Sequence, residues 1–383
     1  MQTILLTTVL LVSAGAFAQT VLPNRANVSL KLEIERAIDQ GLKFLKAEQN
    51  KGGWWSSPEH PALTALPLTA FHGHPTQDYR SKPAGWMRKG YDFIRSTQKP
   101  DGGFYVQGYA NYNTAVSMMG LLTADNPEFN DTLRTARGYL IGLQNDLGVK
   151  GTNDTVFDGG VGYGRRYPHS DLNNTLLALE ALYHSRHLVK TDAPKLASRQ
   201  ELDWKSAISF LQNCQNLPAH NPATEGIDST NKGGFFYYPG FSQAGSITNS
   251  QTGRVSLRSY GSASYAGLLS YVYADLKPED PRVKNVLTWL GENFTLEENP
   301  GMGQQGLYYY LQLITKALST ARADQLETPD GEINWRRAVA LRLIALQKND
   351  GSWVNANNRW WENDPVLATS YCVIALEMIY RGL

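Results

Sequence analysis

The sequence predicts an all-α protein, a closed α/α toroid (α6/α6 barrel) of six two-helix repeats with one long loop insertion. Three observations favour this fold class. A helix–turn–helix unit recurs along the chain. Apolar residues within the units follow the helical period. The first and last units are as apolar and aromatic as the middle ones, whereas an open solenoid needs polar terminal faces, so the pattern favours a ring.

Each repeat has a first helix ending in apolar-x-x-x-Gln, a glycine turn, and a second helix rich in small and apolar residues. The glutamines of the five clear copies are Gln49, Gln98, Gln144, Gln215 and Gln347. A degenerate copy between the fourth and the last has Phe294 instead. Near a helix C-terminus, the glutamine amide is expected to bond backbone groups of the neighbouring turn. Glycine supplies the left-handed cap after the helix.

The second helices of the repeats are expected to form the inner ring, because their small residues permit close packing around a central cavity. In chain order they read "ALTALPLTAF", "NTAVSMMGLLTA", "NTLLALEAL", "SASYAGLLSYVYADL", "GQQGLYYYLQLITKAL" and "ATSYCVIALEMI". No alternating strand pattern of useful length interrupts them, apart from a hint around "GGFFYYPGF".

The N-terminal segment predicts export. The apolar run "ILLTTVLLVSAGAFA" ends in Ala16-Phe17-Ala18 before Gln19, a small-x-small cleavage pattern. Residues 1–18 are therefore predicted to be a signal peptide, with the mature protein starting near Gln19 and located in the periplasm or outside the cell. Residues 19–383 are predicted to form a single toroid domain without a membrane span.

Two insertions, residues 145–160 and 216–258, are rich in Gly, Ser and Asn. The second is too long for a plain connection, and loops of that length are usually functional or disordered. We expect it to lie over one mouth of the ring. The sequence does not decide whether it acts as a lid.

The net charge and the Cys and His residues limit which kinds of binding partner and cofactor are expected. The net charge of +1 gives no reason for binding nucleic acid. The two cysteines, Cys214 and Cys372, lie in apolar helical contexts and are expected to be buried free thiols. The seven histidines show no metal-ligand spacing, so no metal or other cofactor is expected. A small-molecule lipid or glycan is the expected partner, and the oligomeric state stays open.

The glutamine–aromatic repeat resembles the QW motif of the prenyltransferase and squalene-cyclase superfamily over nearly all of residues 31–380. The best single match is "LIALQKNDGSW". The resemblance implies an α/α toroid around a mostly apolar cavity. One toroid is similar to a protein-prenyltransferase catalytic subunit, whereas triterpene cyclases carry two such barrels.

The catalytic motif of class II terpene cyclases, Asp-x-Asp-Asp-Thr, aligns with residues 171–175, "DLNNT". The resemblance puts the proton donor at Asn173, and an amide cannot protonate an alkene. The neighbouring Asp171 is expected to have a lowered pKa, because the helix N-terminus and amide donors favour its carboxylate. Standard cyclisation is therefore not expected.

Prenyltransferase chemistry is not expected either. The resemblance puts the zinc ligands at Gln305, Leu307 and Ala368, and Leu and Ala offer zinc no ligand atom. The stretch "GMGQQ" at residues 301–305 resembles the thioester motif of complement-like domains, but Met302 stands where the thioester needs Cys.

If the inner helices run parallel, their starts gather at one end of the ring, where helix dipoles add positive potential. The candidate ligand-binding residues are Asn113, Asp171, Asn173, Asn174, Gln304, Gln305, Tyr308 and Trp361, and the candidate catalytic residues are Asp171 and Asp364. The alternative for the Asp and Asn residues is helix capping, and the alternative for the tyrosines is core packing.

Two functions remain after the sequence is read. One is a secreted toroid that binds an isoprenoid or other lipid in its cavity without the standard cyclase acid or the prenyltransferase zinc. The other is an enzyme of the terpene-cyclase-like or polysaccharide lyase/hydrolase-like type that uses a carboxylate such as Asp171 or Asp364.

Overall fold

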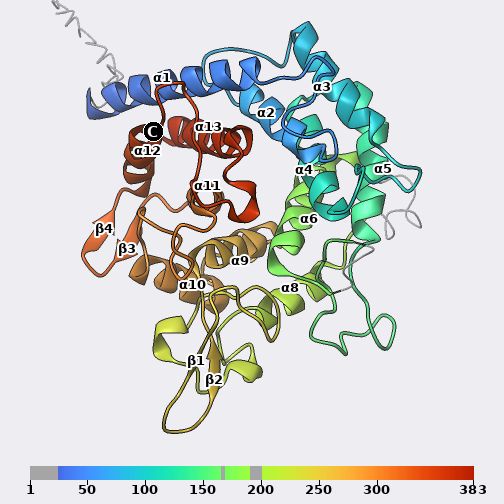
Figure 1. The fold of residues 1–383 in the computed structure, drawn as a ribbon. Helices are drawn as coiled ribbons and strands as arrows, with labels where there is room; N and C mark the ends of the chain where they lie inside the picture. The colour runs from blue at the N-terminus through green and yellow to red at the C-terminus, as the bar shows by residue number, and fades with distance from the viewer. Residues whose placement is uncertain (1–24, 165–168, 190–200) are drawn as a thin grey trace, which may run out of the picture.

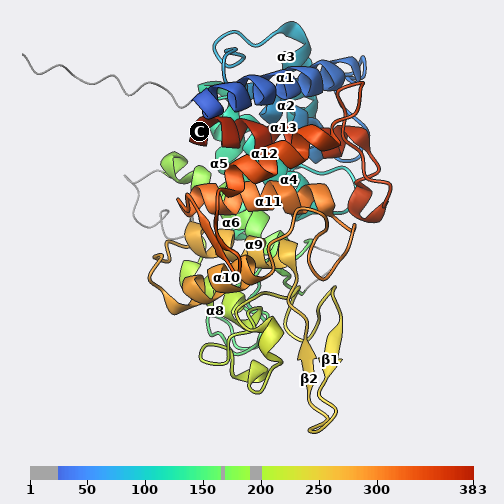
Figure 2. The same ribbon diagram turned by 90° about the vertical axis from the view of Figure 1, so that its left-hand side faces the viewer.

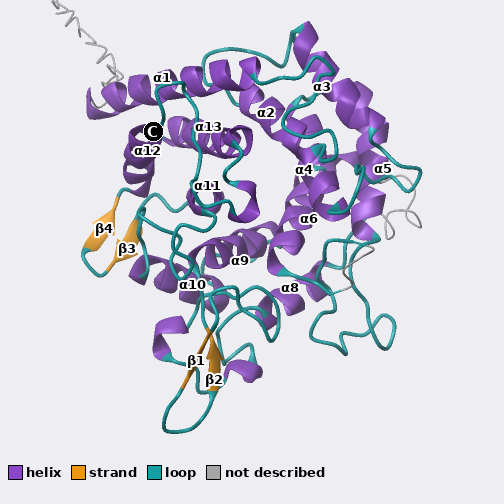
Figure 3. Cartoon of the chain, in the orientation of Figure 1, coloured by secondary structure: helices purple, strands orange, loops and turns teal. Residues whose placement is uncertain are grey.

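A computed structural model describes residues 25–164, 169–189 and 201–383. The predicted signal peptide lies outside the described residues. The described part contains twelve α-helices, arranged as an inner and an outer layer around a common centre (Figures 1 and 3). The predicted all-α class and toroid fold are confirmed by this arrangement and by the structural comparison below.

The two helices of each repeat fall into different layers (Figure 1). The outer helices are α1 (Arg25–Ala47), α3 (Gly85–Ser96), α5 (Asn130–Ile141), α8 (Trp204–Asn213), α10 (Pro281–Glu292) and α12 (Trp335–Leu346). The inner helices are α2 (Ala62–His72), α4 (Ala110–Thr123), α6 (Leu172–His184), α9 (Gly261–Tyr273), α11 (Leu307–Thr320) and α13 (Pro365–Gly382). Each inner helix packs against the next, and α13 packs against α2.

Neighbouring inner helices run parallel. His72 Nδ1 lies 3.2 Å from Thr123 Oγ1, joining the ends of α2 and α4. At the other end of α4, Asn111 Nδ2 donates to the backbone oxygen of Asn174 over 2.8 Å, which joins the starts of α4 and α6. The helix starts therefore gather at one end of the ring, as the candidate site required.

The repeated glutamine joins one repeat to the next. Gln49 Nε2 donates to the Gly53 oxygen and to the Trp86 oxygen in α3, each over 2.9 Å. In the last repeat, Gln347 Nε2 donates to the Gly351 oxygen over 3.0 Å and to the Ala37 oxygen in α1 over 2.9 Å. The predicted bonding of backbone groups by the glutamine amide is confirmed, and the last repeat contacts the first in the same way.

The glycine that follows each of these glutamines has a positive φ where the next outer helix passes closest. Gly53 has φ +94°, and a Cβ there would lie 2.5 Å from the Lys89 oxygen. Gly351 has φ +88°, and a Cβ there would lie 2.4 Å from the Gln40 oxygen. Only glycine permits both the left-handed backbone and this close approach.

The long insertion is only partly at a mouth of the ring. Its hairpin of β1 (Ser246–Thr248) and β2 (Val255–Leu257) extends outward beyond α8 and α10 (Figures 1 and 2). Tyr237 and Gln243, by contrast, line the central cavity. The expected position over a mouth therefore holds for the segment around these two residues and is wrong for the hairpin.

The remaining elements are short. A second hairpin consists of β3 (Leu326–Thr328) and β4 (Gly331–Ile333). The 3-10 helices are Pro127–Phe129, Arg186–Leu188, Pro222–Thr224, Ser229–Asn231 and Arg359–Trp361. Around "GGFFYYPGF" only isolated bridges form, between Gln215 and Phe235 and between Tyr238 and Phe241.

Both cysteines, Cys214 and Cys372, are buried and unpaired, as predicted. Among the helices of the described residues, none combines the length and the apolar character needed to cross a bilayer.

Candidate functional site

The inner helices enclose a cavity of about 680 Å³. That size is within the roughly 300–1,000 Å³ typical of small-molecule sites. Apolar side chains from α2, α4, α6, α11 and α13 line its middle: Leu66, Val116, Met119, Leu176, Leu177, Leu313, Leu367 and Ile374. The middle of the cavity therefore suits a hydrocarbon chain.

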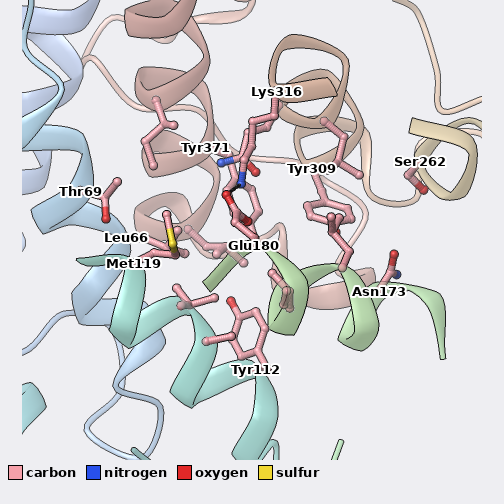
Figure 4. Close-up of a pocket in the computed structure, with 18 of the residues that line it drawn as sticks. Leu66, Thr69, Tyr112, Met119, Asn173, Glu180, Ser262, Tyr309, Lys316 and Tyr371 are labelled. Atoms are coloured by element: carbon pink, nitrogen blue, oxygen red, sulfur yellow. Dashed lines mark ion pairs between the residues drawn. The ribbon is translucent and has the colours of Figure 1, made fainter. Parts of the chain in front are cut away.

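Tyrosines from three inner helices also face this cavity. Figure 4 shows Tyr112 of α4, Tyr309 of α11 and Tyr371 of α13 around it. Burial raises the pKa of Tyr112 to about 12 and raises the pKa of Tyr371 well above its usual value. The phenols are therefore neutral at pH 7, with rings available for packing and hydroxyls for hydrogen bonds.

The three polar residues at the start of α6 have different positions. Asp171 caps the helix: Oδ1 accepts from the Asn174 N–H over 2.9 Å, and Oδ2 accepts from Asn174 Nδ2 over 2.7 Å. Asp171 is fully buried behind the cavity wall. Asn173 and Asn174 line the cavity. Asn173 Oδ1 has no hydrogen-bond partner among the described residues, so Asn173 is the member of the three that is open to a ligand.

The predicted lowering of the pKa of Asp171 is wrong. Burial raises the pKa of Asp171 to about 7, although hydrogen bonds from Asn174, Tyr237 and the Asn173 backbone favour the ionised form. Desolvation outweighs these donors because the carboxyl group has no access to water. The Tyr237 hydrogen bond also connects the buried carboxyl group to a residue of the cavity wall.

Besides Asp171, four of the predicted ligand-binding residues do not line this cavity. Asn113 is buried, and its Oδ1 accepts from the Ala62 N–H over 3.4 Å, between α2 and α4. Gln304 is exposed and donates to the Glu297 oxygen over 2.8 Å, while Gln305 is half-buried outside the wall. Tyr308 is buried in the core, and the adjacent Tyr309 faces the cavity instead.

Asp364, the second candidate catalytic residue, also lies outside this cavity. It caps α13, where Oδ1 accepts from the Val366 N–H over 2.8 Å. It lines a separate, shallower pocket together with His60 and Trp361. The structure therefore keeps Asp364 and Asp171 out of the wall of the central cavity.

Trp361 stands at the mouth near the helix starts, where it lines both pockets. Its ring centroid is 4.8 Å from that of His60 and 5.6 Å from that of Tyr109. Trp360 and Trp361 have φ of 55° and 63°, which is unusual for side chains of this size. Two tryptophans with strained backbone thus border the entrance.

Three glutamates that were not predicted from the sequence also line the cavity. Glu362 accepts from the Tyr309 N–H and from Asn355 Nδ2, each over 2.7 Å. Glu180 forms a 2.5 Å ion pair with Lys316, drawn in Figure 4. Glu377 is 1% exposed. The available signal was a lone Glu inside an apolar inner helix, in "ALEAL" and "ALEMI".

The residues aligned with the zinc ligands do not make a metal site. Leu307 and Ala368 are buried apolar residues. No group of three or more His, Cys, Asp or Glu side chains in the described ranges is arranged to hold a metal ion.

No family model and no curated protein matches the sequence. Among solved structures, the chain is similar to the type II terpene cyclase MstE from Scytonema. A variant of MstE with merosterolic acid A (product) is 12% identical, with a TM-score of 0.54 over 93% of this chain and 99% of that one. A variant with geranylgeranyl dihydroxybenzoate (substrate) is 12% identical, with a TM-score of 0.52 over 93% and 100%.

MstE without ligand gives a similar result, with 12% identity and a TM-score of 0.53 over 92% of this chain and 99% of that one. A structural match at 12% sequence identity indicates a shared fold and does not indicate a shared activity. The chain therefore has the squalene-cyclase-like α/α-toroid fold of the type II terpene cyclase MstE.

Proposed function

We propose that this protein is a secreted toroid, a closed ring of six repeats, that binds an isoprenoid or similar lipid in its central cavity. The observation that carries the proposal is the cavity itself, in which an apolar middle section separates two polar ends. A lipid with a polar group matches that division, because the hydrocarbon part leaves water and the polar part keeps hydrogen-bond partners.

Two further observations support the proposal. The bond from Gln347 to the Ala37 oxygen links the last repeat to the first, as a closed ring requires. The MstE structures of the same fold hold a geranylgeranyl compound as substrate and merosterolic acid A as product. Secretion rests on the signal-peptide pattern of residues 1–18.

The cavity lacks the standard cyclase acid. The amide of Asn173 occupies the aligned position and faces the cavity, and an amide is not a proton donor to an alkene. Binding without standard cyclisation is therefore the function that the wall of the cavity favours.

A second candidate is acid-catalysed chemistry that starts from Asp171. The observation in its favour is the pKa of about 7, which keeps about half of the carboxyl groups protonated at neutral pH. The hydrogen bond to Tyr237 offers a route for a proton toward the cavity. In that case Asp171→Asn abolishes turnover of an isoprenoid and leaves its binding in place.

The test is organic extraction and mass spectrometry of the protein purified from its native host. We expect an isoprenoid or related lipid in close to equimolar amount. Leu177→Trp fills the cavity and is expected to remove that lipid, whereas Leu341→Trp, on the exposed face of α12, is expected to retain it. Circular dichroism checks that both variants fold. A retained glycan, or an empty cavity in the wild-type protein, would contradict the proposal.

A further inference from the structure

The end of the cavity where the inner helices finish has several charged side chains in its wall. Side chains of Arg80, Lys316, Glu377 and Arg381 line it, together with Gly73, which follows the last residue of α2. Lys316 is already neutralised by its ion pair with Glu180. The groups left to meet a ligand are two arginines and one carboxyl group.

The carboxyl group of Glu377 is buried, and one of its oxygens has no polar partner in the described residues. Its Oε1 has no hydrogen bond within the described residues, although the side chain is 1% exposed. A Cβ at Gly73 would lie 1.7 Å from Oε2, so the carboxyl group packs directly against this glycine. A buried polar atom without a partner calls for an explanation, and a ligand in the cavity that Glu377 lines can supply one.

The two arginines lie near Glu377 but do not satisfy it. Arg381 Nη1 donates instead to the Gly73 oxygen over 2.8 Å, which orients the guanidinium beside the carboxyl group. Arg80 is exposed, and its guanidinium makes no ion pair within 4.0 Å in the described part of the chain. Guanidinium N–H groups therefore remain available around the unpartnered carboxyl oxygen.

The charge balance at this end is positive. Burial raises the pKa of Glu377 well above its usual value, against the opposing effect of Arg381 and Arg80, which favours the protonated form of the carboxyl group. Burial lowers the pKa of His184 and, assisted by Arg80, lowers the pKa of His72 to about 4, so both are neutral. Two cationic guanidinium groups then line this end, and a protonated Glu377 adds a third hydrogen-bond donor.

We propose that this end binds an oxyanion, the carboxylate or phosphate head group of an amphipathic lipid, between Arg80, Arg381 and Glu377. This inference rests on the proposed lipid-binding function and adds the polarity and direction of the ligand. The anion accepts from both guanidinium groups and from the Glu377 O–H, and the hydrocarbon chain extends through the apolar middle toward Asn173. Charge-assisted hydrogen bonds of this kind are the strong ones.

The test compares two probes that differ only in the head group, geranylgeranoic acid and geranylgeraniol, by calorimetric titration of the full chain at pH 7. We expect the acid to bind about tenfold or more tightly than the alcohol, the difference that one to two charge-assisted hydrogen bonds provide. Acetate and inorganic phosphate are titrated alongside and are expected to bind far more weakly, because a free anion leaves the apolar middle unfilled.

Arg80→Gln is expected to remove most of the preference for the acid while the affinity for the alcohol stays the same. Arg337→Gln, on the exposed side of α12 and outside the cavity, is the matched control and is expected to keep the preference. Glu377→Gln retains a donor and is expected to change the affinity for the acid by less than about threefold. A large gain in that variant would show that Glu377 is ionised and would overturn the assignment.

The outcomes separate the two proposals. Equal affinities for acid and alcohol, unchanged in Arg80→Gln, overturn the head-group inference and leave lipid binding standing. Binding of free phosphate as tight as that of the acid overturns the lipid source of the oxyanion. Binding of neither isoprenoid removes lipid binding and the head-group inference together.

Discussion

The two ends of the cavity contain polar residues for different reasons. Where the inner helices start, Asp171 and Asn174 bond each other and the helix backbone, and only the Asn173 Oδ1 atom of these three side chains is without a hydrogen-bond partner in the described residues. Where the helices finish, Glu377 lies inside an apolar helix and caps nothing. Helix starts need polar side chains for their own backbone, whereas a charge inside an apolar helix costs free energy. The second end is therefore the better indicator of function.

The largest effect is expected from breaking the ion pair at the helix-finish end. Lys316→Met leaves Glu180 buried without its partner and should lower the free energy of unfolding by about 3–5 kcal/mol. The double variant Lys316→Met/Glu180→Leu should recover most of that loss, because no unpaired charge remains. Denaturant unfolding measures both.

Asp275→Asn is the matched control, because it breaks the exposed ion pair between Asp275 and Arg186. It should cost less than about 1 kcal/mol. A cost for Lys316→Met no larger than this control would mean that the ion pair does not help to hold the cavity together.

The second largest effect is expected in the pH dependence of stability, and it comes from the buried carboxyl group of Asp171 at the helix-start end. The pKa of Asp171 is about 7 in the folded protein, against 3.8 ordinarily. Between these values the folded state binds more protons than the unfolded state, so stability is greatest at low pH. It should fall by on the order of 3 kcal/mol as the pH rises from about 4 to 7. Asp171→Asn, which keeps a capping oxygen, should lack this fall when unfolding is measured across that range.

Asp203→Asn provides a control of opposite sign. Asp203 caps α8, and although burial opposes it, hydrogen bonds from Ser206 lower the pKa of Asp203. That group adds stability as the pH rises, and its variant should lose the increase. Parallel pH profiles for the wild-type protein and Asp171→Asn would contradict the raised pKa.

The smallest effects on stability are expected from replacing the two adjacent residues Asn173 and Asn174. Asn174→Ala removes bonds to Asp171 and Asn111 and should cost about 1–3 kcal/mol. Asn173→Ala removes an oxygen that bonds nothing in the described residues, and should change stability by less than about 0.5 kcal/mol. Thermal unfolding of the two variants is sufficient. An equal cost for both would assign Asn173 to the fold and not to a ligand.

The fold followed from the sequence because the repeat unit acts locally and the same way each time. Gln49 and Gln347 make equivalent bonds at opposite ends of the chain, and Gly53 and Gly351 allow equivalent close approaches. When the same residues make the same contacts in every repeat, the pattern can be recognised in a single sequence. The hairpin in residues 216–258 has no such repetition, and the prediction that it lies over a mouth of the ring was wrong.

The site could be predicted from the sequence only in part, because the direction and burial of a side chain depend on the whole ring. Sequence reasoning selected Asn173, which faces the cavity, but chose Tyr308 where Tyr309 faces it. The pKa of Asp171 was predicted to be lowered, because only its local hydrogen-bond donors can be read from the sequence. The complete burial that raises it depends on the tertiary structure. Glu377 was not among the predicted site residues, although a lone Glu inside an apolar helix is a signal that the sequence contains.

A crystal structure of the full chain with geranylgeranoic acid tests the central claim most directly. We expect the hydrocarbon chain in the apolar middle of the cavity, and the carboxylate within hydrogen-bond distance of Arg80, Arg381 and Glu377. A carboxylate at the opposite end, beside Asn173 and Trp361, would contradict the direction of binding. A cavity filled only by water at saturating acid would contradict lipid binding itself.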